Sequence, residues 1–319
     1  MKTKLVSTLF AAGLSLLAAQ AMAAWPERTV KFIVPFPAGG PADGAMRIVG
    51  KRLGEIWGQP VVVENKAGAP GMVSVASAPV DGYTLLLGAG SNIVTSPLIN
   101  KQLAYKRSDF APISLLVTSS SILTVHPGVP AKNIKEFIGL AKASKTELTY
   151  GSSGIGSPGH LTVELFEQLT GAKLLHIPFK GGTPLVADLV AGHIHMAVNA
   201  TPSVIQHVQA GKLVPLAVLS RQRDRSLPNV PTMTESGVPN LEFDVWYGIF
   251  GPAKLAPDII EKISTDIRKV LAEPEVEKAI QAQGNESAGT TPQQLVRMIT
   301  EEARVWEKLI ADRKLSVDN

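Results

Sequence analysis

Strand-like and helix-like segments alternate along almost the whole chain after residue 24, and this alternation restricts the fold more than any other feature. The first unit begins with an apolar run at Val30–Val34, passes through a Gly/Pro-rich loop and enters a segment with helical periodicity. In that segment Met46, Val49, Leu53 and Ile56 recur at the spacing of one helix face. Repeated units of this kind are typical of α/β proteins whose sheets are mostly parallel and are flanked by helices.

The repeating pattern breaks at two places, and these breaks divide the chain into two lobes. The strand-like runs 113–117 and 122–125 are separated by the polar stretch 118–121, and a second βαβ series ends near 219–224. If the chain crosses between the lobes twice, its middle segment forms one lobe, and that lobe is inserted into a lobe built from both ends of the chain. We therefore expect a first lobe made of residues 24–122 and 221–319, and a second lobe made of residues 123–220. A cleft between two such lobes is a common place for a small-molecule site.

The first 23 residues have the pattern of a cleaved export signal. Lys2 and Lys4 precede an apolar run at 5–19, and Ala21 and Ala23 form an A-x-A cleavage site. The apolar run is shorter than the roughly 20 residues that a membrane-spanning helix needs. We expect residues 1–23 to be removed after Ala23, leaving a soluble protein in a bacterial periplasm.

Composition and charge exclude several classes of function. The 319-residue chain contains no cysteine, so disulfides, thiolate zinc sites, iron–sulfur clusters and a cysteine nucleophile are excluded. Without Lys2 and Lys4, 29 of the 31 basic residues remain against 27 acidic ones. A net charge this small, spread along an exported chain, argues against nucleic-acid binding.

Three loops between a strand and a helix are rich in Gly, Ser and Pro, at residues 35–43, 88–92 and 150–160. Ligands of parallel α/β sheets bind at the carboxyl ends of the strands. A helix that starts there offers unpaired N–H groups, which suit an anion. In the first loop, Asp43 is a candidate cap for the following helix. Because glycine-rich turns also occur where no ligand binds, the loops alone leave a ligand role open.

Two other types of site are weakly indicated. The Gly-x-Gly-x-x-Gly pattern at 154–159 matches a dinucleotide-binding loop, but the strand-like run at 174–177 is not followed by the acidic residue that would hold a ribose. His193 and His195 lie on one face of a predicted strand, as in some metal sites, but no third ligand is identifiable. We therefore expect neither a cofactor nor a metal ion.

A serine hydrolase is the enzymatic alternative. Ser152 or Ser153 could act as the nucleophile with His160 as the base, but the G-x-S-x-G elbow is absent. His160 could equally donate to a ligand or only line the start of a helix. Trp246 and Tyr247 are predicted core residues, with an aromatic cleft wall as the alternative.

Taken together and in order, the motifs resemble the solute receptors of tripartite tricarboxylate transporters, the Bug-type periplasmic receptors. The resemblance covers essentially the whole chain after the leader. Its motifs are WPER at 25–28, PFPAGG at 35–40, NKAG at 65–68, DGYTLL at 81–86, SSGIGSPGHL at 152–161, PFKG at 178–181, AGKL at 210–213 and LPNVPTMTESG at 227–237.

The resemblance implies a two-lobed periplasmic-binding-protein-like fold of type II that closes around a small organic carboxylate. Such a receptor is not an enzyme, and it delivers its ligand to the membrane subunits of a tripartite tricarboxylate-type transporter. We expect a monomer. A di- or tricarboxylate, an aromatic acid and an acidic amino-acid derivative all remain open as ligands. A sensor partner that presents the ligand to a membrane kinase is the other alternative.

The resemblance also implies which positions surround the ligand. They lie in the three loops and in the segments after the next two strands: Ala38, Gly39, Asp43, Ser91, Asn92, Ser152, Ser153, His160, Phe179, Gly181, Thr183 and Asn199, with Lys180 beside them. At one dipeptide the chain departs from the pattern of the receptors that it resembles, because Asn199-Ala200 stands where such receptors often carry Asp-Asn. This change removes a negative charge from the cleft wall, and we hypothesise that it alters ligand choice.

Overall fold

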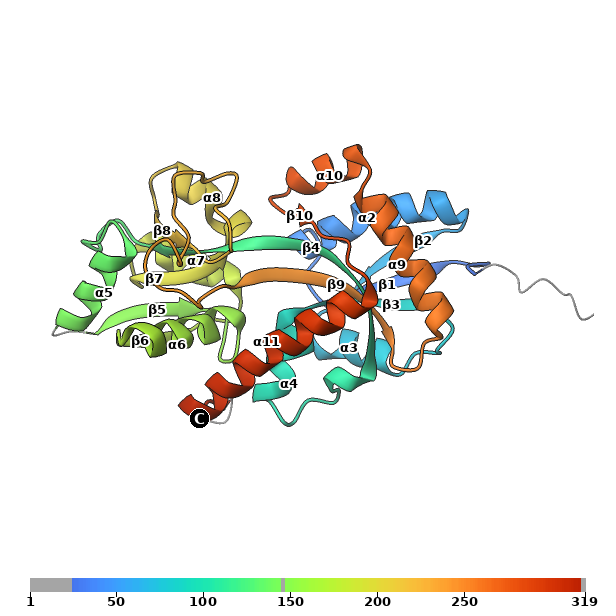
Figure 1. The fold of residues 1–319 in the computed structure, drawn as a ribbon, viewed down its shortest axis with the longest axis horizontal. Helices are drawn as coiled ribbons and strands as arrows, with labels where there is room; N and C mark the ends of the chain where they lie inside the picture. The colour runs from blue at the N-terminus through green and yellow to red at the C-terminus, as the bar shows by residue number, and fades with distance from the viewer. Residues whose placement is uncertain (1–24, 145–146, 317–319) are drawn as a thin grey trace, which may run out of the picture.

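The computed structural model describes residues 25–144 and 147–316, so the predicted export signal at 1–23 lies outside the described residues. The described residues form a two-lobed α/β fold built on a ten-stranded curled sheet. The first lobe occupies the right of Figure 1 and the second lobe the left, and long strands join them. None of the helices in this part of the chain is long and apolar enough to cross a membrane.

The first lobe starts with three parallel strands and the helices between them. In chain order these are β1 (Val30–Val34), α2 (Pro41–Trp57), β2 (Val61–Asn65), α3 (Ala69–Ala76) and β3 (Thr84–Ala89). Helix α2 begins with a proline in its first turn, where the missing N–H costs no hydrogen bond within the helix. It is capped at its C-terminus by Gly58, whose φ is 62°. It buries Met46, Val49 and Leu53, as its periodicity predicts, but Ile56, the fourth residue of the predicted face, is 42% exposed near the end of the helix. Helix α3 was not predicted.

One of the strands that join the two lobes is continuous, where the sequence suggested two separate strands. Strand β4 (Phe110–Val125) pairs antiparallel with β9 (Asp244–Pro252) up to Ser120, and with β7 from Ser121 onward. The predicted break at 118–121 is therefore wrong. Hydroxyl side chains lower the hydropathy of this stretch, but the backbone stays extended because it has strand partners on the way.

The second lobe repeats the alternation. Its elements are α5 (Ile134–Ala143), β5 (Leu148–Ser152), α6 (Pro158–Thr170), β6 (Leu174–Pro178), α7 (Gly182–Ala191), β7 (Met196–Ala200), α8 (Thr201–Gln209) and β8 (Val214–Val218). Strand β5 pairs parallel with β6 and β7, while β7 and β8 pair antiparallel with β4. The expectation of parallel pairing holds among β1, β2 and β3 in the first lobe and among β5, β6 and β7 in the second. It needs correction at the centre, because the crossing strands run against their neighbours.

The remaining elements complete both lobes. They are the π-helix η1 (Ser91–Thr95), α4 (Ser96–Ile99), the 3-10 turn η2 (Arg107–Asp109), α9 (Pro257–Leu271), α10 (Pro274–Gln281), β10 (Glu286–Ser287) and α11 (Pro292–Arg313). Residues 221–240 form turns and bends, as predicted. Helix α11 runs across the front of the molecule from one lobe to the other (Figure 1).

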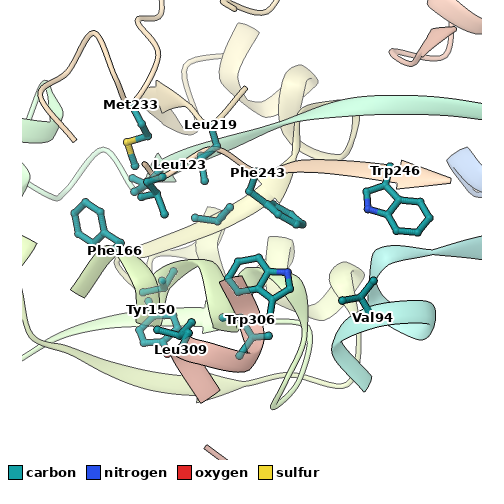
Figure 2. Packing of buried hydrophobic residues seen from close by; sticks show 14 of the residues in the cluster. Val94, Leu123, Tyr150, Phe166, Leu219, Met233, Phe243, Trp246, Trp306 and Leu309 are labelled. Carbon is teal, nitrogen blue, oxygen red and sulfur yellow. The ribbon is translucent and has the colours of Figure 1, made fainter. Parts of the chain in front are cut away.

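The hydrophobic core is continuous beneath α11. One cluster of buried side chains includes Leu123 of β4, Phe166 of α6, Trp246 of β9 and Trp306 of α11 (Figure 2). Trp246 is 4% exposed, which confirms its prediction as a core residue. Two further clusters lie under α2 and α9 in the first lobe and under α7 and α8 in the second. The lobes therefore share packed side chains as well as two strands.

Candidate functional site

The carboxyl ends of strands from both lobes face one another along the crossing strands. Ala89, the last residue of β3, is opposite Tyr247 of β9, and Tyr247 is opposite Val117 of β4. Ala200, the last residue of β7, is opposite Ser121 of β4. Four residue steps of extended chain lead from Val117 to Ser121, which is about 13 Å at the usual rise per residue. The carboxyl ends of β3 and β7 thus face each other from the two lobes across a gap along residues 118–120 of β4.

Three predicted loops meet at one small recess. The recess has a volume of about 60 Å³ and is lined by Phe36, by Ala89, Gly90 and Ser91, by Pro158, and by the stretch 243–247 of β9. Pro158 belongs to the second lobe, and the other loop residues belong to the first. The Gly/Pro loop at 35–43 and the Gly/Ser loop at 150–160 therefore each contribute one residue to the same hollow. Among the predicted ligand-contacting residues, all of which the structure describes, Ser91 is the one that lines it.

An internal network of hydrogen bonds fixes the first loop. The backbone N–H of Gly39 donates to the Asp43 carboxylate at 2.9 Å, and Arg47 Nε and Asn65 Nδ2 donate to the same group at 2.9 Å each. Burial alone would raise the pKa of Asp43, but these hydrogen bonds outweigh it and hold the pKa below its usual value. The helix cap is Gly40 and not Asp43, which lies inside the first turn. Asp43 thus holds the loop whose exposed tip carries Ala38 and Gly39.

The second loop is built against a buried carboxylate. The backbone N–H of Ala89 donates to Asn92 Oδ1 at 2.8 Å, and Ser91 lines the recess. A Cβ on Gly90 would lie 3.0 Å from both Glu302 Oε1 and Trp246 Nε1, so a larger residue would displace them. The main chain therefore lies directly on the Glu302 carboxylate, a contact that sequence reasoning missed.

Two indole groups hold Glu302 in place. Trp246 Nε1 and Trp306 Nε1 donate to its two carboxylate oxygens at 2.7 Å and 3.0 Å. Burial raises the pKa of Glu302, and the two indole hydrogen bonds only partly oppose the rise. This carboxylate ties α11 to the crossing strand β9 beside the recess.

The third loop rests on a stack of rings. Ser152 is fully buried, accepts a hydrogen bond from the Gly154 backbone N–H at 3.2 Å, and lies 2.7 Å from His176 Nε2. Gly156 donates its backbone N–H to His160 Nδ1 at 3.1 Å, and His160 is 4% exposed. Ser153 is exposed at the turn. Sequence reasoning missed His176, which lies 24 residues from its serine partner.

The last predicted positions lie around the ends of β6 and β7. The backbone N–H of Phe179 donates to the Ser152 carbonyl at 2.9 Å, which joins this segment to the third loop. Gly181 precedes α7 with φ 105°, a conformation that favours glycine, while Lys180 and Thr183 are exposed. Asn199 is 9% exposed, and its side-chain Nδ2 is buried without a hydrogen-bond partner.

A larger cavity lies between the lobes and includes none of the predicted residues. It has a volume of about 730 Å³ and is lined from both lobes, with Ser120, Asp224 and Asn285 among its residues. Ser120 Oγ is 2.7 Å from Thr201 Oγ1 and also bonds the Asp224 carboxylate. The polar stretch at 118–121 in the sequence was the only signal for this cavity.

The geometry does not assemble the alternative sites. Among residues 25–144 and 147–316 no three His, Asp or Glu side chains are grouped to hold a metal ion. His195 Nδ1 lies 2.8 Å from Thr149 Oγ1, while His193 faces Asp188 at 3.4 Å. Within the described residues His160 accepts from Gly156 and forms no hydrogen bond with Ser152 or Ser153. Ser152 pairs with His176 instead and is fully buried.

The fold has two lobes joined by two strands, and loops of both lobes converge between them. These features define the class of two-lobed solute-binding proteins. Residues 45–315 match the model of the TctC family, described as the tripartite tricarboxylate transporter family receptor. The chain belongs to this family.

Solved structures agree with this assignment. The chain is 31% identical to Rpa4515 of R. palustris with adipate, with a TM-score of 0.81 over 92% of this chain and 99% of the other. It is 30% identical to the periplasmic binding protein BugD, with a TM-score of 0.77 over 92% and 99% of the two chains. It is 27% identical to MatC from Rhodopseudomonas palustris with bound malate, with a TM-score of 0.76 over 90% and 100%.

Proposed function

We propose that the protein is a receptor that binds one small organic acid between its lobes and does not transform it. The observation that carries this proposal is the convergence of loops from both lobes on one recess beside the crossing strands. Two similar proteins are described with adipate and with malate, both of which are dicarboxylates. A carboxylate is therefore the ligand group that the proposal assigns to this gap.

The energetics favour binding by main-chain donors. Removing a carboxylate from water costs several kcal/mol unless it is well paired. Each hydrogen bond to a charged group returns about 1.5–3 kcal/mol, and a helix N-terminus adds roughly 0.3–1 kcal/mol. A micromolar receptor needs only about 8 kcal/mol in total. Several N–H and hydroxyl donors around one carboxylate meet this requirement without an arginine.

The predicted residues take two roles in this proposal. The exposed or half-exposed ones are assigned to direct contact with the ligand: Ala38, Gly39, Ser91, Ser153, Phe179, Gly181 and Thr183. The buried or internally bonded ones are assigned to holding the loops: Asp43, Asn92, Ser152, His160 and Asn199. The lobes are proposed to divide at residues 122/123 and 220/221.

The family also supports a proposed location and partner. The match to a tripartite transporter receptor and the export-signal pattern at 1–23 both fit a periplasmic protein that hands its ligand to membrane transporter subunits. Capture of those subunits by tagged receptor in native membranes, increased by ligand, tests the partner. Capture of a membrane kinase instead would favour the sensor alternative.

A thermal-shift screen against organic acids, followed by calorimetry, tests the binding function. At about 100 times its dissociation constant, a ligand should add roughly 2.7 kcal/mol to the free energy of unfolding. The panel should include adipate, malate, citrate, benzoate and glutamate at matched ionic strength. Ser153→Ala should weaken binding, whereas Ser226→Ala, an exposed serine in the other cavity, should not. The proposal fails if no acid stabilises the protein, or if an ester is turned over with loss of activity in Ser153→Ala.

A further inference from the structure

Three aromatic rings are stacked under the loop at 153–157. Tyr150 of β5 and His176 of β6 have ring centroids 4.7 Å apart, and His176 and His160 of α6 have centroids 4.2 Å apart with planes inclined by 22°. The stack is buried within the second lobe, and none of its polar atoms is needed for catalysis in a receptor. The Tyr150 hydroxyl donates to Glu164, His176 pairs with Ser152, and His160 alone of the three rings bonds the loop itself.

His160 holds this loop at two points. Its backbone N–H donates to Ser157 Oγ at 3.4 Å, which caps α6. Its ring Nδ1 accepts the backbone N–H of Gly156 at 3.1 Å. Because a backbone N–H is a donor only, Nδ1 must carry a lone pair, and the ring must be neutral with its proton on Nε2. That Nε2 faces Glu164 Oε1 at 3.8 Å.

The surroundings of His160 favour this neutral state. The groups that face it are Tyr150 on β5, His176 on β6, Glu164 on its own helix and Arg313 on α11, with Glu167 bonded to the same arginine. Burial lowers the pKa of His160; Glu164 opposes the shift, and Arg313 adds to it. Burial and repulsion by His160 lower the pKa of His176 to about 4.

We propose that His160 is a positioning residue whose neutral ring holds the loop at 153–157 in its ligand-binding form, and that protonation of His160 releases this loop. The proposal rests on the function proposed above and deepens it. A proton on Nδ1 would place two donors against each other and break the hydrogen bond to Gly156. Ser153, which begins this loop and is assigned above to ligand contact, would then lose the position that the ordered loop gives it.

The position of Gly156 shows why a small change in this loop matters. Its φ is 73°, and a Cβ placed there would lie 2.6 Å from Ile99 Cγ2 of the first lobe. The loop therefore contacts the opposite lobe directly. A loop that loses its bond to His160 no longer fits this contact, so we expect acid to weaken ligand binding through closure as well as through Ser153.

The first test needs no ligand. The amide resonance of Gly156 is followed by NMR from pH 8 to pH 4 together with the ring resonances of all histidines. In the wild type, the Gly156 amide should shift and lose hydrogen-exchange protection with the same midpoint as the His160 ring, below 6.5. A Gly156 amide that stays unchanged while His160 titrates would overturn the proposal.

Two variants separate positioning from general stability. His160→Asn keeps an acceptor near the position of Nδ1 but cannot be protonated in this range, so the acid transition of Gly156 should disappear. His193→Asn removes an exposed histidine from the same lobe and should leave the transition unchanged. If His160→Asn does not fold, the wild-type titration still decides the question.

The second test measures adipate affinity against pH in the wild type and in His160→Asn. From pH 7.5 to one unit below the His160 midpoint, the wild type should lose roughly tenfold more affinity than His160→Asn, the amount expected from one lost hydrogen bond. Equal losses in both proteins would contradict the link to binding. If the Gly156 transition is present but no acid binds at pH 7.5, the proposed function fails while the role of His160 in the loop stands.

Discussion

Replacing Arg313 should destabilise the protein through the two carboxylates that it leaves behind. Arg313, at the end of α11, donates from Nε to Glu164 Oε2 at 2.7 Å and also bonds Glu167. Both glutamates are 9% exposed, whereas the arginine side chain is 34% exposed. Glu164 also accepts from the Tyr150 hydroxyl at 3.1 Å, and Glu167 accepts from the Leu174 N–H at 2.6 Å. This cluster attaches α11 to the second lobe through partly buried polar groups.

The cost follows from what remains after Arg313→Met. Breaking a buried ion pair by removing one partner costs about 3–5 kcal/mol. Because water reaches the arginine, and because the remaining donors stay in place, we expect roughly 2–4 kcal/mol. Burial already raises the pKa of Glu167, and Arg313 opposes that rise. Without the arginine, Glu167 takes up a proton more readily, so the loss of stability should be smaller at pH 5 than at pH 8.

Urea unfolding followed by tryptophan fluorescence measures this cost, and Lys308→Met is the matched control. Lys308 lies on the same helix and pairs with Asp312 at 2.6 Å, but both side chains are exposed. The control loses the same charge and should cost less than about 0.5 kcal/mol. For a chain of this size, Arg313→Met should also lower Tm by roughly 3–7 °C. Equal losses in the two variants would refute the argument that buried carboxylates set the cost.

Three further outcomes follow from the geometry. Gly156→Ala should cost roughly 1–3 kcal/mol and weaken ligand binding, because it combines a positive φ with a clash against Ile99; calorimetry that shows unchanged affinity would contradict this. Glu302→Gln should destabilise by roughly 1–3 kcal/mol because one indole loses its acceptor. This penalty should shrink as pH rises above the ordinary glutamate pKa, because only the wild type then bears a buried charge. A penalty that does not change with pH in urea titrations is the opposing result. Asn199→Asp should change the order of affinities in the acid panel, with the most highly charged anions weakened most, and an unchanged order would refute a role in ligand choice.

The sequence predicts the architecture because the relevant signals are local. Helical periodicity depends on residues close together in the chain, and the structure confirms it for Met46, Val49 and Leu53 of α2. The continuity of β4 could not be predicted in this way. Its polar centre at 118–121 is extended because β9 and β7 pair with it, and both lie far away in sequence. Helix α3 was missed because its eight residues, APGMVSVA, contain a proline, a glycine and two valines, which are poor helix formers.

The candidate site likewise has local features that the sequence predicts and long-range contacts that it does not. Its loops were predicted from Gly, Ser and Pro at strand ends, and the structure brings three of them to one recess. The side chains that support these loops were missed because they come from distant segments. His176 reaches Ser152 across 24 residues, and Glu302 reaches Trp246 across 56. A single sequence does not specify such pairs, because they depend on how the strands and α11 pack.

The support of the loops also bears on where ligand selectivity can arise. Each loop is held by side chains of the protein itself. These are Asp43 for the first loop, Glu302 and Asn92 for the second, and His160 with Ser152 for the third. The main-chain donors are therefore ordered before a ligand arrives, which reduces the entropy lost on binding. Main-chain N–H groups recognise any carboxylate in the same way. Under the proposed assignment, discrimination between one acid and another comes from the few side chains assigned to ligand contact, such as Ser91, Ser153 and Thr183, and from the uncharged amide of Asn199.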